Sequence, residues 1–475
     1  MSQRQVCFNV QELVRCAADA IQADRCVKIE KYPDGMYNKR MLLTMSNGSQ
    51  VVAKVPNPNA GLAHFTTASE VATMDFARNV LQTPTPRILA WSPRAQANPV
   101  GAEYIIMEKA PGVELETFWP TLSIQERLAV VKAMAAYQKA WASVSFKQFG
   151  SLYYAEDLDI KSSTGPLYTD VNGCDVWDDR YAIGLSTARE WVDHGRATVQ
   201  LDRGPWNSLQ QYHEAIGRRE EAAVKQLRRM PTSPITLFGP GTYQPTRERN
   251  LAALEKYLQL IKYLVPTDRN TSSAHIWHPD LHVANIFVDP SEPTKIVSLI
   301  DWQSTEIGPL YFQARQPHII DYDGPPVSGL ERLVLPKDLV YAAMQFQQTM
   351  SYNLLLLARN LFIDGEATYL LQVAELESQW SELPGSNGAP YLFKLSVAER
   401  KEMEAQVEGV IRGMEAMRAI HDALGELFPE QGVVKPEQYD EALDALGQMK
   451  EQVIEEFART EEERRQWEEA WPFGA

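Results

Sequence analysis

The sequence predicts an α+β fold in which a strand-rich amino-terminal part precedes a longer and mostly helical remainder. Three observations support this prediction. Short apolar segments alternate with turns from Cys26 to Pro56, an apolar hairpin pattern covers residues 286–300, and helical periodicity dominates after Pro336. The chain has 475 residues, 44% of them hydrophobic, which suffices for a large core and for two or three domains.

The amino-terminal part should begin with a short amphipathic helix over residues 10–21, packed on the domain that follows. Three strands are expected next, with the sequences CVKIEKY, MLLTM and VVAKV. Asn47-Gly48 predicts a hairpin between the second and the third. The turn Asp34-Gly35 joins the first two, and its one glycine would let backbone N–H groups approach a phosphate. An ordinary hairpin turn is the simpler interpretation.

Lys54 interrupts the apolar third strand, where an unpaired ammonium group would be costly to bury. The helix expected over residues 68–81 offers Glu70 as a partner, and Asp75 on the same helix is the second choice. An ion pair between Lys54 and Glu70 is therefore predicted. An exposed lysine on an edge strand is the alternative.

The next hairpin lies within residues 278–303. Its expected strands run from Ile286 to Val288 and from Ile296 to Ile300, joined by a turn that holds Pro290 and Pro293. Both strands are apolar, so we expect them to be buried.

Polar side chains gather at the open end of this hairpin. Asn285 should lie across from Asp301, and Asp280 precedes them on the loop that leads to the same edge. Two carboxylates and an amide oxygen would then converge, a ligand set that suits Mg²⁺. The alternative is that these side chains only form turns, and that three nearby histidines are ordinary hydrogen-bonded residues: His275, His278 and His282.

The remaining elements are mostly helical. A long stretch over about residues 151–265 precedes the hairpin, and a polar segment over residues 162–179 lies near its start. Helices are expected there around residues 190–198, 208–230 and 246–264. After Pro336, helices are expected over residues 337–363, 366–381, 396–427 and 436–471.

The formal net charge of −16 argues against nucleic acid as a primary partner. Residues 437–471 contain twelve acidic and four basic side chains, which favours a solvated helical face or an interaction tail there. The longest run without charge, residues 339–358, contains six polar side chains. We therefore interpret it as a buried helix and expect no membrane span.

The cysteines and the first 25 residues indicate the compartment. Cys7, Cys16, Cys26 and Cys174 lack metal-binding spacing, so free thiols in a reducing compartment are expected. The first 25 residues contain no apolar signal core, and acidic residues interrupt their arginines. A cytoplasmic location is therefore predicted.

Several motifs carry a family resemblance. The pattern H-x-D-x-x-x-x-N from His278 to Asn285, followed by an apolar strand and Ile300-Asp301, looks like the catalytic and metal loops of kinase-like phosphotransferases. His-Pro-Asp and Asp-Trp stand where protein kinases carry His-Arg-Asp and Asp-Phe-Gly. With VVAKVPNPNAG, TTASEVATMDFAR and GAEYIIMEKAPGVEL, the chain resembles the fungal branch of the aminoglycoside phosphotransferase and choline kinase-like superfamily, over roughly residues 8–317.

This resemblance implies a bilobal protein-kinase-like fold. Residues 26–109 would form a small β-rich N-lobe after an N-terminal helix within residues 1–25. Residues 110–335 would form a large, mostly helical C-lobe with a helical insertion at about 151–265. Residues 336–475 would complete the C-lobe with helices and the acidic tail.

The resemblance also implies roles for the residues at the hairpin. Asp280 would be the catalytic base for a substrate hydroxyl, and His278 would support the catalytic loop. Asn285 and Asp301 would bind Mg²⁺.

For the nucleotide, the resemblance implies that Lys54, paired with Glu70, holds the phosphates of ATP beneath the turn at Gly35. This turn departs from the family pattern, in which relatives tend to carry two glycines. The strand over residues 103–107 would lead into the hinge that binds adenine, with Met107 as gatekeeper and the backbones of Glu108 and Ala110 as contacts.

The implied function is an ATP- and Mg²⁺-dependent phosphotransferase that moves the γ-phosphate to a hydroxyl group of a small molecule. The alternative is a catalytically weak or inactive kinase-like nucleotide-binding scaffold in mitochondria, favoured by the glycine-poor turn and the acidic tail. A protein kinase is disfavoured, because no Ala-Pro-Glu segment follows Asp301.

Overall fold

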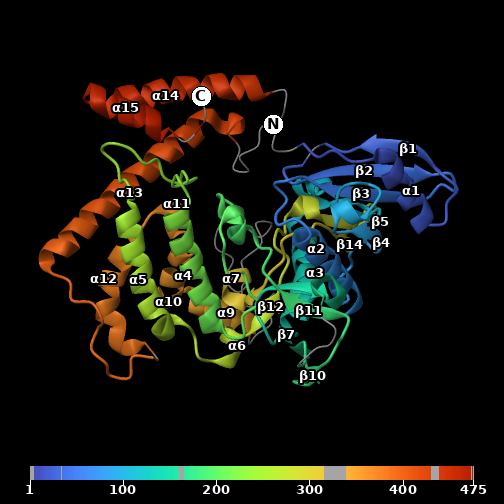
Figure 1. Cartoon of the computed structure of the whole chain (residues 1–475), viewed down its shortest axis with the longest axis horizontal. Coiled ribbons are helices and arrows are strands. Elements are labelled where there is room, and N and C mark those ends of the chain that lie inside the picture. Colours follow the sequence, from blue (N-terminus) through green and yellow to red (C-terminus); the bar gives the residue numbers. More distant parts are fainter. Residues whose placement is uncertain are drawn as a thin grey trace. The chain divides into compact units, whose positions relative to one another are not determined.

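The computed structural model describes residues 5–33, 35–159, 165–314, 339–383, 385–428, 438–471 and 473 (Figure 1). The chain forms two compact units. The first comprises Met1–Thr198, Asp202–Tyr212 and Pro266–Gln347, and the second comprises Val199–Leu201, His213–Val265 and Gln348–Ala475. Strands dominate the beginning of the chain and helices dominate the rest, so the predicted α+β class is confirmed.

The amino-terminal sheet of the first unit has five antiparallel strands in the order β1-β2-β3-β5-β4. Alternate residues of β2 point into the core, with Met41, Leu43 and Met45 buried beside Leu13 of the predicted first helix. The strands and the two helices that pack on them are β1 (Cys26–Lys31), β2 (Asn38–Met45), β3 (Gln50–Pro56), β4 (Ile88–Ser92), β5 (Tyr104–Glu108), α1 (Val10–Ala20) and α2 (Phe65–Asn79).

The predicted hairpin is present as β13 (Ile286–Asp289) and β14 (Glu292–Leu299), extended by the short strand β6 (Val113–Glu114) and covered by α3 (Ile124–Ala142). Two details of its prediction are wrong. Pro293 lies within β14 and not in the turn. Asn285 lies across from Ile300, whose N–H donates to the Asn285 carbonyl at 3.0 Å, and not from the predicted Asp301. The strand pairing is irregular on both sides of Val288, which changes the register along the hairpin.

Short strands complete the first unit. Five of them form a sheet in the order β10-β9-β7-β12-β15, and β8 pairs with β11. Their bounds are β7 (Ser145–Phe146), β8 (Ser151–Tyr154), β9 (Tyr168–Thr169), β10 (Asp175–Val176), β11 (Tyr181–Gly184), β12 (Ala274–Ile276) and β15 (Ile307–Pro309). The helix expected around residues 190–198 is wrong, because only the 3₁₀ turns Arg189–Trp191 and Arg196–Thr198 form there.

The second unit is helical. In the part of the chain that the structure describes, α5 packs against α10, α10 against α12, and α12 against α13. The predicted helices near residues 208–230, 246–264, 366–381 and 396–427 are confirmed in substance. The first unit also contains α6 (Arg269–Ser272), α7 (Leu310–Gln313) and α9 (Leu339–Gln347). The described helices that lie wholly or mostly in the second unit are α4 (Leu209–Gln226), α5 (Arg247–Leu264), α10 (Met350–Ala358), α11 (Leu361–Asp364), α12 (Ala367–Gln379), α13 (Val397–Leu424), α14 (Tyr439–Phe457) and α15 (Glu461–Ala470).

Two long helices expected from the sequence are interrupted, and each break carries a threonine cap. Thr349 separates α9 from α10 and accepts a hydrogen bond from the Tyr352 N–H, so residues 339–358 do not form one continuous helix. Thr460 caps α15 in the same way and separates it from α14. Of the predicted starts, Lys337 and Pro436 lie outside the described residues. No helix of the described residues has the length and apolar character that a membrane crossing requires.

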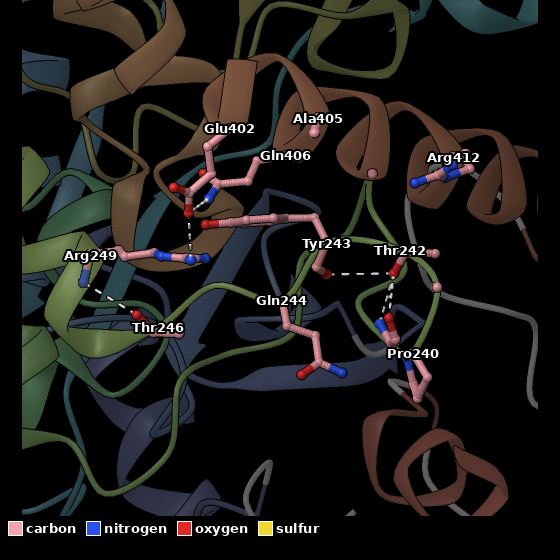
Figure 2. A pocket seen from close by; sticks show the side chains of 13 residues that line it. Pro240, Thr242, Tyr243, Gln244, Thr246, Arg249, Glu402, Ala405, Gln406 and Arg412 are labelled. Atoms are coloured by element: carbon pink, nitrogen blue, oxygen red, sulfur yellow. Dashed lines mark hydrogen bonds and ion pairs between the residues drawn. The ribbon is translucent and has the colours of Figure 1, made fainter. Parts of the chain in front are cut away.

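The loop before α5 lies directly against α13. The Leu237 N–H donates to the Gly413 carbonyl at 3.0 Å, and a Cβ on Gly413 would come within 2.6 Å of the Leu237 carbonyl oxygen. The same loop and helix line a polar hollow of about 550 Å³, in which Arg249 reaches Glu402 at 3.4 Å (Figure 2). Small residues on this face of α13 therefore allow the loop to approach the helix backbone.

We expect Gly413→Ala to lower the free energy of unfolding by about 1–3 kcal/mol, although alanine is the better helix former, because the new methyl group meets a backbone oxygen. Gly447→Ala is the matched control, because nothing lies within 4 Å of a Cβ at that position of α14. It should raise stability by about 0.5–1 kcal/mol. Urea unfolding measures both, and equal effects would contradict the close packing of loop and helix.

Candidate active site

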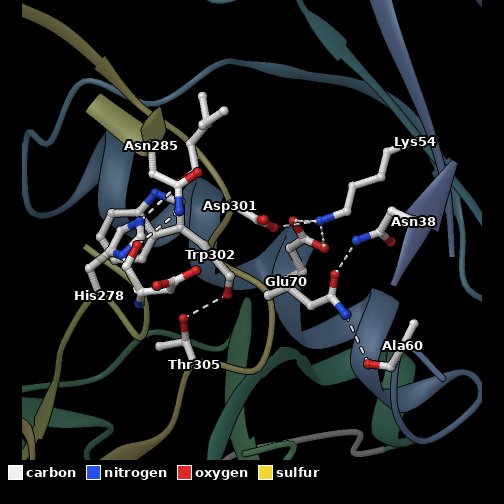
Figure 3. Close-up of polar contacts among 12 residues, drawn as sticks. Asn38, Lys54, Ala60, Glu70, His278, Asn285, Asp301, Trp302 and Thr305 are labelled. Atoms are coloured by element: carbon white, nitrogen blue, oxygen red, sulfur yellow. Dashed lines mark hydrogen bonds and ion pairs between the residues drawn. The ribbon is translucent and has the colours of Figure 1, made fainter. Parts of the chain in front are cut away.

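The candidate site is built around the ammonium group of Lys54, in the middle of β3. Its Nζ lies 2.7 and 2.9 Å from the two carboxylate oxygens of Glu70 on α2, and 2.9 Å from Oδ1 of Asp301, two residues after the end of β14 (Figure 3). Lys54 is 4% exposed and Glu70 is 3% exposed. One buried cation thus connects the amino-terminal sheet, a helix and the hairpin.

The predicted ion pair between Lys54 and Glu70 is confirmed as a contact. Burial of a lone ammonium group would be costly, and two carboxylates offset that cost. The nearby Lys54 ammonium holds the pKa of Asp301 below its usual range, so Asp301 is charged at neutral pH. Asp75, the second choice as partner, instead accepts a hydrogen bond from the Tyr181 hydroxyl.

His278 holds the loop before the hairpin. Its Nδ1 accepts the Asp280 N–H at 3.2 Å, so Nε2 carries the proton and donates to the Ile300 carbonyl at 2.9 Å. The imidazole lies against the ring of Trp302, with centroids 4.6 Å apart. Burial lowers the pKa of His278 to about 4. A neutral imidazole therefore connects the segment of Asp280 to the strand end that precedes Asp301.

The Asp280 carboxylate is open to solvent, with 68% of its side chain exposed. Its Oδ2 lies 3.4 Å from Nε2 of His282, and this contact lowers the pKa of Asp280 and raises that of His282. Sequence reasoning treated His282 only as an ordinary histidine. Its position two residues after Asp280 and three before Asn285 was the available signal.

Asn285 is buried, and its amide nitrogen faces the Asp280 backbone. Nδ2 donates to the Asp280 carbonyl at 2.9 Å and lies 3.0 Å from Nε2 of His282. Among the described residues, Oδ1 of Asn285 accepts no hydrogen bond. This orientation leaves an amide oxygen available to a ligand on the side of the hairpin where Asp301 follows β14.

The side-chain oxygens of Asp301 and Asn285 are of a type that binds Mg²⁺. A carboxylate from Asp301 and an amide oxygen from Asn285 are hard ligands of the kind that this ion selects. The described residues contain no cluster of three or more His, Cys, Asp or Glu side chains arranged around a metal. An ion held here would complete its octahedron with phosphate oxygens and water, which is usual for Mg²⁺ beside a nucleotide.

The residues predicted to bind nucleotide lie in the same unit. Met107 is buried in β5, and Glu108 ends this strand, with its carboxylate accepting from Arg87 at 2.9 Å. The N–H of Ala110 forms no hydrogen bond with any described residue, so it is available to a ligand. The N–H of Gly35 donates to the Asn38 carbonyl at 3.3 Å, whereas Asp34 lies outside the described residues.

Comparison with known proteins supplies a family. The family model described as "Phosphotransferase enzyme family" matches residues 28–313, which include every predicted site residue. A subtelomeric hrmA-associated cluster protein of Aspergillus fumigatus is 33% identical over 346 residues, 67% of this chain and 65% of that protein. The altered inheritance of mitochondria protein 9 of Lachancea thermotolerans is 26% identical over 347 residues, 68% of this chain and 55% of that protein. The chain thus spans less than two thirds of each relative's length.

Solved structures are also similar. The gentamicin complex of APH(2″)-IIa is 13% identical with a TM-score of 0.36, over 86% of this chain and 97% of that one. The macrolide 2′-phosphotransferase MphH of Brachybacterium faecium is 12% identical with a TM-score of 0.31, over 83% and 96%.

The buried His278 should make the protein sensitive to acid. Its pKa is about 4 when folded and near 6.5 when unfolded, so the stability that its neutral form provides above pH 6.5 is lost as the pH falls toward 4. The full loss for this group is about 3 kcal/mol. Below pH 6.5 the wild type takes up a proton at His278 when it unfolds, and His278→Asn removes this uptake. The difference in free energy of unfolding between wild type and variant, measured with urea, should therefore become smaller from pH 7 to pH 5. A difference that stays constant would contradict a neutral buried imidazole.

Proposed function

The chain belongs to the phosphotransferase enzyme family, and on that premise we propose that it transfers the γ-phosphate of ATP, with Mg²⁺, to a hydroxyl group of a small molecule. The observation that carries the proposal is the buried Lys54 ammonium, held between Glu70 and Asp301. Asn285 lies at the same end of the hairpin as Asp301, and its amide oxygen accepts no hydrogen bond from a described residue. A cation and metal-binding oxygens at one place suit a polyphosphate.

In the proposed reaction, the acceptor oxygen attacks the γ-phosphorus and the bond from that phosphorus to the β,γ-bridging oxygen breaks. ADP leaves with the bridging oxygen, the acceptor becomes a phosphomonoester, and Asp280 takes the hydroxyl proton. Asp280 suits this role because its carboxylate is exposed and its pKa is lowered by His282, so it is ionised at neutral pH. Bound Mg²⁺ would neutralise phosphate charge, with Asn285 and Asp301 as its protein ligands.

On the nucleotide side, Lys54 would contact the phosphates while Glu70 keeps its ammonium in place. The turn at Gly35 would cover the phosphates, and the adenine edge would meet the backbones of Glu108 and Ala110 below Met107. The free N–H of Ala110 at the end of β5 supports this assignment, since a hinge contact needs a donor without an internal partner.

The second candidate is a nucleotide-binding scaffold with weak or no catalysis. The single glycine of the turn at Gly35 favours it, and the retention of Lys54, Asp280, Asn285 and Asp301 disfavours it. The mitochondrial name of one group of relatives supports mitochondria as the compartment, against the cytoplasm expected from the thiols.

Nucleotide binding is tested by thermal unfolding of the wild type with ATP, with Mg²⁺ and with both. A ligand that binds only the folded state raises the melting temperature, so we expect the largest rise with both together. Asp301→Asn should abolish the Mg²⁺-dependent part of the rise. Asp289→Asn, at the opposite end of the same hairpin, is the matched control and should behave as wild type. No rise in any protein would exclude both candidate functions.

Catalysis is tested by Asp280→Asn. We expect this variant to bind Mg-ATP as wild type does, because Asp280 contacts neither Lys54 nor Asp301, while phosphate transfer to small alcohols falls by about 10²–10⁴-fold. Release of ADP, followed across a panel of hydroxyl compounds, measures the rate. Wild type that binds Mg-ATP without transfer to any acceptor in that panel would favour the scaffold.

A further inference from the structure

The carbonyl oxygen of Ala60 is a meeting point of three distant segments. It accepts a hydrogen bond from Nε2 of Gln303 at 2.8 Å and another from Nη1 of Arg189 at 3.1 Å. Gln303 stands two residues after Asp301, and its Oε1 accepts from Nδ2 of Asn38 at 2.7 Å (Figure 3, at Asn38 and Ala60). The segment that follows the hairpin is thus connected to the first residue of β2 and to the loop between β3 and α2.

Ala60 is connected in turn to the turn around Gly35. Asn57 receives the Ala60 N–H on its carbonyl, donates its own N–H to the Tyr37 carbonyl at 2.8 Å, and donates Nδ2 to the Met36 carbonyl at 3.0 Å. An unbroken series of hydrogen bonds therefore runs from the residue after Trp302 to the backbone directly after Gly35.

Arg189 reaches the same place from residues 186–198, a segment that the family resemblance assigned to the insertion. Its Nη1 also donates to the Asn59 carbonyl at 2.9 Å, its guanidinium is paired with Asp193, and its Cζ lies 4.1 Å from the centre of the Tyr37 ring. The arginine thus contacts the turn through a ring face and contacts the adjacent loop through two carbonyls.

We infer that Arg189 and Gln303 are positioning residues that hold residues 35–37, the described part of the turn, in place over the nucleotide phosphates. The inference rests on the proposed function, and it deepens it by assigning the control of that turn to two side chains outside the amino-terminal sheet. Arg189, Gln303 and the backbone of residues 57–60 together form what we call the latch.

The reason for a latch follows from the turn itself. A phosphate-covering turn with one glycine has few conformations in which its N–H groups point at a phosphate, so the productive one must be held by other contacts. The latch supplies these contacts through Gln303, two residues after Asp301, and through Arg189 in residues 186–198. Without it, only a fraction of the molecules would hold residues 35–37 in the productive position, and the apparent affinity for the nucleotide would be reduced to that fraction.

Both side chains donate to the same carbonyl, so the effects of their removal on Mg-ATP affinity should not add. If one contact alone cannot hold residues 35–37, removing either side chain releases them, and removing the second lowers the affinity little further. The double variant should then resemble each single variant, whereas two independent packing contacts would give additive effects.

Calorimetric binding tests the latch with two probes, Mg-ATP and adenosine. We expect Arg189→Met and Gln303→Met each to weaken Mg-ATP binding about five- to tenfold, with adenosine unchanged because it lacks phosphates. The double variant should match the single ones. Arg180→Met is the control for the arginine, because Arg180 also pairs with an aspartate, Asp178, and lies over a tyrosine ring. Gln148→Met, which removes a glutamine contact to Asn207, is the control for Gln303.

The outcomes separate the latch from the proposed function. Wild type that binds no Mg-ATP would overturn the function. Wild type that binds Mg-ATP while both latch variants bind it equally well would overturn the latch alone. Loss of adenosine and Mg-ATP affinity in parallel would also overturn the latch, because it would indicate a general structural defect.

Discussion

A single buried ammonium group constrains the first unit. Lys54 stands in a strand between the fully buried Ala53 and Val55, and its charge is tolerated only because Glu70 and Asp301 approach within 3 Å. This requirement fixes the rotation of α2 about its axis and the position of the segment that follows β14. The same arrangement leaves Asp301 ionised, and Asp301 lies at the end of the hairpin where Asn285 is also found. The charged groups that stabilise the buried Lys54 in the fold are therefore also groups to which the proposed function assigns a role.

The sequence predicted the contact between Lys54 and Glu70 but not the contact between Lys54 and Asp301. A lysine in an apolar strand must have a partner, and a helix sixteen residues later supplies Glu70, so the pair could be inferred from local pattern alone. Asp301 lies 247 residues from Lys54, and no periodicity connects them. The hairpin was predicted, but the residue across from Asn285 was displaced by one, because irregular strand pairing depends on packing that sequence alternation does not reveal.

Helix boundaries illustrate the same limit. The apolar run from Leu339 to Ala358 is continuous in sequence, yet Thr349 accepts a backbone hydrogen bond and begins a new helix. Threonine is common inside helices, so its capping role emerges only when the chain must change direction. His282 was underestimated for a related reason, since the value of an imidazole depends on the carboxylate and the amide that tertiary structure brings to it.

The contact at Ala60 differs in kind from the others, because its acceptor belongs to the backbone. Any residue at position 60 other than one that distorts the loop would present the same carbonyl oxygen to Arg189 and Gln303. The interaction therefore places almost no constraint on which amino acid occupies this position. Methods that infer proximity from correlated substitutions would find no signal between position 60 and its two donors. A connection between two parts of a protein can thus be structurally direct and yet leave no trace in the evolution of one partner.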